Sequence, residues 1–199
     1  MKTSSLIAGI LTACLTAYAH DSKPADVTAY VTGDSLPSSV DSGARATVTW
    51  VFARVGVRLA WKAGDPKPGA ASGSPVTIRI RFIKGAPADA SRNALAYALP
   101  FGEGVTIIIM YDRIREAAQE SRREQAILAH VLAHEISHVL QGTNQHSETG
   151  LMKARWNGQD YDAMQQKPLE FTSFNVTLIQ NGLTAKKAQT PAFSTVTLN

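Results

Sequence analysis

In this chain of 199 residues, the pattern most typical of an active site consists of two histidines and a glutamate. His134, Glu135 and His138 follow the order His-Glu-x-x-His. Residues four apart on a helix lie one turn above each other on the same face, so both imidazoles can reach one metal ion. Glu135 lies roughly 100° around the helix from His134, where it can reach a water at the metal without binding the ion itself. The pattern therefore predicts a hydrolytic zinc site with Glu135 as the general base.

A catalytic zinc needs a third protein ligand, and three residues are candidates. His130 precedes His138 by eight residues, roughly 12 Å along a helix, which is too far for both to bind one ion with another histidine between them. His146 follows Gly142, and glycine allows the left-handed backbone that ends a helix and turns the chain back. Glu170 lies farther along the chain. We therefore expect His146 to complete the zinc site, with Glu170 as the competing third ligand.

Zinc on three imidazoles implies a reaction in which water attacks a carbonyl carbon. Three neutral imidazoles leave a fourth position for water, whose pKa the ion lowers. Glu135 then accepts the proton and passes it to the leaving amine. Tyr161 and His130 are both candidates for a further donor to the oxyanion, and the sequence does not select between them. The alternative function is a zinc-binding protein without peptidase activity, in which the unliganded Glu135 would have no use.

Residues 134–152 resemble the zinc-binding signature of the metzincin peptidases, which is His-Glu-x-x-His-x-x-Gly-x-x-His followed by a methionine turn. Here one additional residue precedes Gly142 and another precedes His146, so the segment is a spacing variant. Ser147, directly after the third histidine, is similar to the matrixin branch. The resemblance implies a zincin-like fold, zinc on the three histidines, a packing floor at Met152, and a polypeptide or peptide substrate.

Alternating and continuous apolar runs predict the strands of one sheet. Residues 76–83 alternate between apolar and polar side chains, and residues 105–110 are continuously apolar. Shorter strand patterns occur at 27–31, 57–61 and 94–99. The metzincin resemblance implies that substrate binds along an edge of the sheet as an added strand. We expect residues 94–99 to form this edge, because a proline and two glycines follow them.

Helical patterns precede and follow these strands. A first helix is predicted over residues 44–55, and a long helix over 112–142 carries the histidines. A last helix is predicted over 168–181, ended by Gly182. This order predicts an α+β, zincin-like single domain with a small mixed sheet, an active-site helix and a C-terminal helix.

The expected domain plan has four parts. Residues 1–19 are a signal peptide, and residues 20–40 are a polar N-terminal segment or a short propeptide. Residues 41–183 form the catalytic domain, and residues 184–199 are a flexible tail.

The N-terminus predicts export from the cytoplasm. Residues 1–19 combine a positive start, a short apolar run and small residues at Ala17 and Ala19, as in a Sec signal peptide cleaved after Ala19. This implies a secreted or periplasmic protein. Residues 11–14 (Leu-Thr-Ala-Cys) resemble a bacterial lipobox, so a lipoprotein anchored at Cys14 is the alternative. Cleavage after Ala19 would remove the single cysteine and with it any disulfide or thiolate ligand.

Charge and hydropathy exclude two classes of partner. The formal charge is +4, from 20 basic and 16 acidic residues that are scattered along the chain, so no nucleic-acid footprint is expected. No segment after the signal peptide is apolar enough to span a membrane. The sequence does not indicate the oligomeric state.

Overall fold

The computed structural model describes residues 26–67, 76–88, 90–91, 94–100, 105–119 and 121–189. The predicted signal peptide and Cys14 lie outside these residues. Five strands and five helices occur in the described part of the chain. They are β1 (Val27–Gly33), α1 (Ser38–Ala53), β2 (Leu59–Ala63), β3 (Val76–Ile83), β4 (Ala96–Pro100), β5 (Val105–Met110), α2 (Tyr111–Ala118), α3 (Ser121–Gln141), α4 (Gly158–Gln166) and α5 (Ser173–Gln189).

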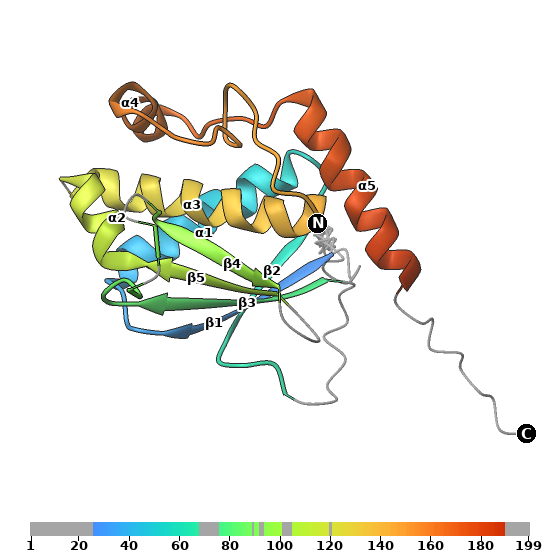
Figure 1. The fold of residues 1–199 in the computed structure, drawn as a ribbon, viewed down its shortest axis with the longest axis horizontal. Coiled ribbons are helices and arrows are strands. Elements are labelled where there is room, and N and C mark those ends of the chain that lie inside the picture. Colours follow the sequence, from blue (N-terminus) through green and yellow to red (C-terminus); the bar gives the residue numbers. More distant parts are fainter. Residues whose placement is uncertain are drawn as a thin grey trace, which may run out of the picture.

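The strands form one mixed sheet in the order β2-β1-β3-β5-β4. The first four are parallel, and β4 alone runs antiparallel, next to β5 (Figure 1). The predicted α+β fold with a mixed sheet is confirmed, as is the edge position of the strand predicted at 94–99. The strands predicted at 76–83 and 105–110 match β3 and β5 residue for residue.

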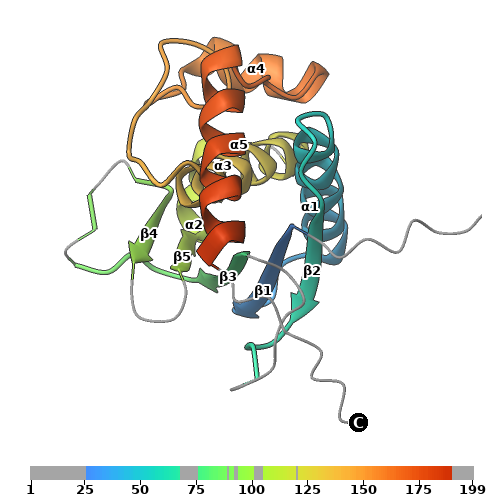
Figure 2. The ribbon, with the colours of Figure 1, turned by 90° about the vertical axis from the view of Figure 1, so that its right-hand side faces the viewer.

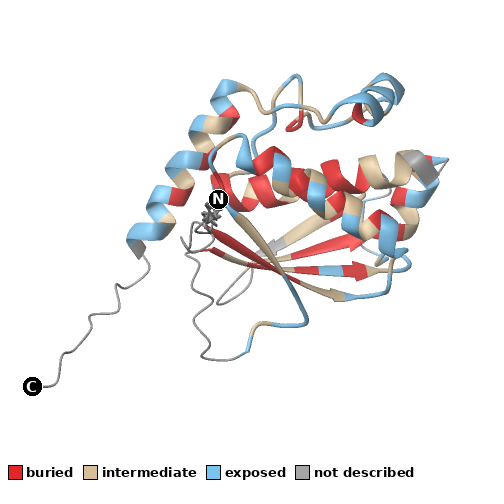
Figure 3. Ribbon diagram, turned by 180° about the vertical axis from the view of Figure 1, so that it is seen from behind, coloured by how far each residue is buried: buried red, intermediate tan, exposed pale blue. Residues whose placement is uncertain are grey.

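The helices gather on one face of the sheet, with α3 at the centre of the helical layer (Figures 1 and 2). On β3, Ile78 and Ile80 are fully buried, whereas Arg81 between the buried positions is exposed. On α3, Leu128 and Leu132 are also fully buried. Figure 3 shows buried residues both in the strands and in the helices above them. Burying such side chains is the main stabilising contribution to the fold, and it anchors the helix that carries the histidines.

The long helix predicted over 112–142 is two helices. Gln119 has φ 57°, a left-handed backbone that ends α2 before α3 begins at Ser121. Gly142 has φ 66° and ends α3, as the sequence predicted. The break turns α2 so that Arg113 and Glu116 reach the same pocket as the histidines.

The helix predicted over 168–181 also has different limits. It begins at Ser173 and continues through Gly182 to Gln189, so the first part of the predicted tail at 184–199 is helical. A Cβ on Gly182 would lie 1.8 Å from the backbone oxygen of Leu140. This glycine therefore allows α5 to approach α3 closely, and it does not end the helix.

Two further elements differ from the sequence-based expectation. Within residues 20–40, β1 is an interior strand between β2 and β3, and α1 begins at Ser38, so this segment belongs to the folded domain. The short helix α4 was not predicted, although Asn157 and Asp160 form a reciprocal capping box at its start.

In the part of the chain that the structure describes, no helix has the length and apolar character needed to cross a membrane.

Candidate metal centre

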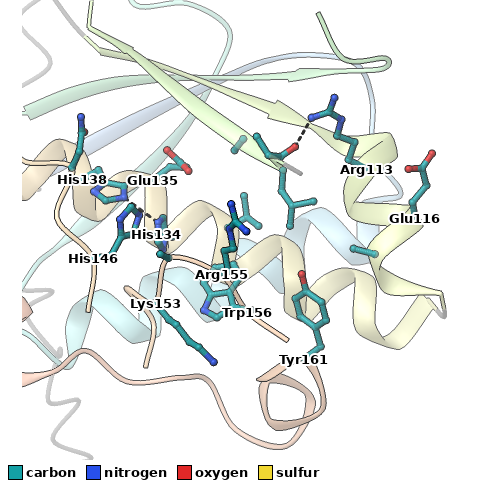
Figure 4. Close-up of a pocket in the computed structure, with 17 residues that line it drawn as sticks. Arg113, Glu116, His134, Glu135, His138, His146, Lys153, Arg155, Trp156 and Tyr161 are labelled. Atoms are coloured by element: carbon teal, nitrogen blue, oxygen red, sulfur yellow. Dashed lines mark hydrogen bonds between the residues drawn. The ribbon is translucent and has the colours of Figure 1, made fainter. Parts of the chain in front are cut away.

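The three histidines predicted to bind metal come together at the end of α3. His134 and His138 lie one turn apart on α3, and His146 approaches them from the loop that follows (Figure 4). One ligand nitrogen from each ring lies within 4.8 Å of the other two. The ring centroids are 4.6 Å apart for His134 and His138, 5.2 Å for His134 and His146, and 4.9 Å for His138 and His146. The cluster can therefore hold a metal ion.

Backbone carbonyls orient two of these rings. Nδ1 of His134 lies 3.0 Å from the oxygen of Leu151, and Nδ1 of His138 lies 2.9 Å from the oxygen of Thr143. A carbonyl oxygen only accepts, so each Nδ1 carries the proton and each Nε2 keeps its lone pair. Such a contact on the far nitrogen is the usual way in which proteins orient a metal-binding histidine.

The protonation state of the rings also suits a metal. Burial lowers the pKa of His134 to about 4, and this outweighs the opposing hydrogen bond to Leu151. Burial likewise lowers the pKa of His138. The two Nε2 atoms are 3.0 Å apart, with no proton between them to share. Tetrahedral ligands at about 2.0–2.1 Å from zinc lie roughly 3.3 Å apart, so these residues fit an ion between them.

The loop that carries His146 is held in place by backbone contacts of the residues that follow this histidine. After the ring, the N–H of Ser147 donates to the oxygen of Met152 at 2.8 Å. Met152 is fully buried. The N–H of Leu151 donates to the backbone oxygen of Glu170 at 2.9 Å, and Gly150 turns the chain there with φ 76°. The additional residues in the histidine spacing therefore do not keep the third imidazole away from the other two.

Glu170, the alternative third ligand, is not part of the cluster. Its side chain forms ion pairs with Lys167 at 2.7 Å and Arg54 at 3.6 Å, and 54% of it is exposed. Only the backbone of Glu170 contributes to the site, through its contact with Leu151. A carboxylate turned outward to two cations cannot bind the ion at the histidines.

His130 is a packed histidine with both ring nitrogens engaged. Its Nδ1 donates to the oxygen of Ala126 at 2.7 Å, and its Nε2 accepts the N–H of Leu169 at 2.8 Å. The residue is only 2% exposed. It therefore connects α3 to the segment before α5, and it has no free nitrogen for metal or for an oxyanion. Of the two oxyanion donors considered from the sequence, only Tyr161 lines the pocket.

Glu135 lies beside the histidines in an environment that favours proton transfer. Its side chain lines the same pocket as His134, His138 and His146. Burial raises the pKa of Glu135 to about 7. A carboxyl group in this position can accept and release a proton, as a general base must.

The pocket in front of the cluster has a volume of about 690 Å³. Its walls include Leu95 and Ala96 at the start of β4, and Trp156 from the segment after Met152. The ring of Trp156 meets that of His134 edge-on at 5.4 Å, and its Nε1 donates to the oxygen of Gly150 at 3.4 Å. A volume of this size lies within the range that is typical of ligand-binding pockets.

Sequence reasoning did not find Trp156, Lys153 and Arg155 as pocket residues. The only signal in the sequence was their position, because they closely follow Met152, the residue that the metzincin resemblance places below the metal. The partners Leu151 and Thr143 were also missed, since they act through backbone oxygens and their side chains carry no information.

No protein-family model matches the chain, and no curated protein is significantly similar to it.

Proposed function

We propose that the chain is a zinc-dependent peptidase of the metzincin type, exported by its N-terminal signal, that hydrolyses peptide bonds in polypeptide or peptide substrates. One observation carries the proposal. Three imidazoles converge in a pocket that also contains a half-buried carboxyl group, Glu135. A purely structural metal site has no need for an unliganded carboxyl beside the ligands. The donor set also suits other transition metals, and zinc is proposed because it serves hydrolysis at such sites.

Zinc bound at the three histidines would supply a Lewis acid that polarises the scissile carbonyl and lowers the pKa of the attacking water. Glu135 accepts a proton from that water and delivers it to the nitrogen of the leaving amine. The carbonyl oxygens of Leu151 and Thr143 hold the rings of His134 and His138 in orientation throughout.

The sheet edge beside the pocket offers a place for the substrate. Among the described strands, β4 pairs only with β5, so its other edge is open to a further strand. A peptide added there would bring its backbone past Ala96 and into the pocket that holds Glu135. This supports a substrate bound in an extended conformation.

The substitution Glu135→Gln tests the proposal. The variant should keep the zinc content of the wild type, because it leaves all three ligands in place. Its rate of cleavage in a broad peptide library should fall at least about 100-fold, since the proton acceptor is lost. Zinc is measured by elemental analysis, and cleavage by mass spectrometry of the library.

Two results would contradict the proposal. Undiminished cleavage by Glu135→Gln would remove Glu135 from the reaction. Tight zinc binding by a wild-type protein that cleaves no peptide would favour the alternative, a zinc-binding protein without peptidase activity. Mass spectrometry of the protein from its native host tests the export step, with His20 or a lipid-modified Cys14 as the two possible first residues.

A further inference from the structure

One arginine in the pocket, Arg155, has no hydrogen-bond or ion-pair partner among the residues that the structure describes. Arg155 lines the same cavity as His134 and Glu135, and it extends into the space between His134 and Tyr161 (Figure 4). The residue is exposed, and it takes part in no hydrogen bond or ion pair within the described part of the chain. A guanidinium that faces a binding pocket without a partner is available to a ligand.

The other cations of the pocket are already engaged. Nζ of Lys153 lies 2.6 Å from Oδ2 of Asp160, which offsets its charge. Arg113 donates to the backbone oxygens of Ala94, at 2.7 Å, and of Ser91. The carboxyl group of Glu116 lies at the same end of the pocket as Arg113 (Figure 4). Arg155 is therefore the cation of this pocket with neither a carboxylate nor a carbonyl partner in the described residues.

The backbone around Arg155 is fixed on both sides. Oδ2 of Asp160 accepts from Nζ of Lys153 and also from the N–H of Asn157, at 2.8 Å. The Asp160 carboxylate therefore links Lys153 and Asn157, which lie two positions before and two positions after Arg155. The next residue, Trp156, contacts the ring of His134. The base of the Arg155 side chain is therefore held close to the metal site, which reduces the entropy lost when it binds a ligand.

From this arrangement we infer that Arg155 selects substrates with a carboxylate close to the bond that is cut. The inference rests on the proposed peptidase function and names a substrate class for the same site. A guanidinium binds a carboxylate through two parallel N–H···O contacts, which gives orientation as well as affinity. Because Arg155 directly precedes the residue that touches His134, the recognised group must lie within a few residues of the scissile bond.

The carboxylate can come from two sources, an internal aspartate or glutamate side chain or the free C-terminus of a short peptide. Both present the same group to Arg155. Matched peptides separate them. The first set carries Glu, Gln or Lys at each position near a cleavable bond, with the C-terminus amidated. The second set contains only neutral side chains and has either a free or an amidated C-terminus.

The test compares kcat/KM for these peptides in zinc-loaded wild type, Arg155→Gln and Arg81→Gln. Arg81 is exposed on β3 and does not line the pocket, so its variant loses the same charge far from the site. We expect wild type to prefer the Glu peptide, or the free C-terminus, by about tenfold over its neutral match. Arg155→Gln should remove this preference and change kcat/KM for the neutral peptides by less than about twofold. Arg81→Gln should keep the preference.

A second measurement does not depend on turnover. In the Glu135→Gln background, binding of the same peptides is followed by calorimetry, with and without Arg155→Gln. Weaker binding of the carboxylate peptides alone supports the inference, even if the wild type cleaves nothing and the peptidase proposal fails. Equal binding of Glu, Gln and Lys peptides by the protein with Arg155 intact would overturn it. An unchanged preference in Arg155→Gln would overturn it too.

Discussion

Gly182 lies inside α5 at the point where this helix touches the end of α3. A Cβ added at Gly182 would lie 1.8 Å from the backbone oxygen of Leu140 and 2.9 Å from its carbonyl carbon. Real Cβ atoms essentially never lie closer than 3.0 Å to such atoms. The obstacle is backbone and cannot rotate away, so Gly182→Ala forces α5 and α3 apart by about 1 Å or more.

Two opposing contributions decide the size of the effect. Alanine favours a helix interior over glycine by about 1 kcal/mol. Overpacking costs about 1–3 kcal/mol. Separation of the helices also weakens the packing of Ile179 and Leu183, which are both buried in the core and are each worth about 1.5–3 kcal/mol when fully buried. The losses are larger than the gain, and we expect Gly182→Ala to lower the free energy of unfolding by about 1–3 kcal/mol.

Thermal unfolding followed by circular dichroism measures this change. For a domain of this size, 1 kcal/mol corresponds to about 2–4 °C, so the midpoint should fall by about 2–12 °C. Gly158→Ala is the matched control, because a Cβ there meets no atom within 4 Å, and its midpoint should stay the same or rise. If Gly182→Ala were as stable as the wild type, the close approach of α5 to α3 would be wrong.

Three further substitutions test the site and the fold. His146→Ala should weaken zinc binding by roughly 100-fold or more in a chelator competition, whereas Glu170→Ala should leave it unchanged; the reverse result would make Glu170 the third ligand. Burial by itself would raise the pKa of Asp26, but hydrogen bonds from Lys187 and Arg58 outweigh it and hold the pKa below its usual value. The carboxylate therefore stabilises the fold above about pH 4, and this contribution disappears as the pH falls through the lowered pKa. Asp26→Asn should cost about 1–2 kcal/mol at pH 7 in urea unfolding, and this cost should shrink as the pH falls through the lowered pKa of Asp26; a cost independent of pH would contradict the assignment.

Local patterns in the sequence predicted two strands with their observed limits and the histidines that come together at the site. The alternation in β3 and the apolar run in β5 identified both strands in full, because the side chains of a strand follow a period of two on their own backbone. His134, Glu135 and His138 were found for the same reason, since the helical period alone places both imidazoles on one face. Gly142 as the end of α3 depended only on the backbone freedom of glycine.

Contacts between distant segments were decided only by the tertiary structure. Gly182 looked like a helix end, yet it is the point where α5 meets the backbone of Leu140, and no local pattern distinguishes these roles. For the same reason, the sequence could not exclude Glu170 as the third metal ligand. The structure does so, because the carboxylate of Glu170 forms ion pairs with Lys167 and Arg54. Apart from its position after Met152, the sequence did not single out Arg155, because the role inferred for it depends on which neighbouring cations already have partners. Periodicity describes one segment and its own backbone, whereas the partner of a side chain depends on every segment that packs against it.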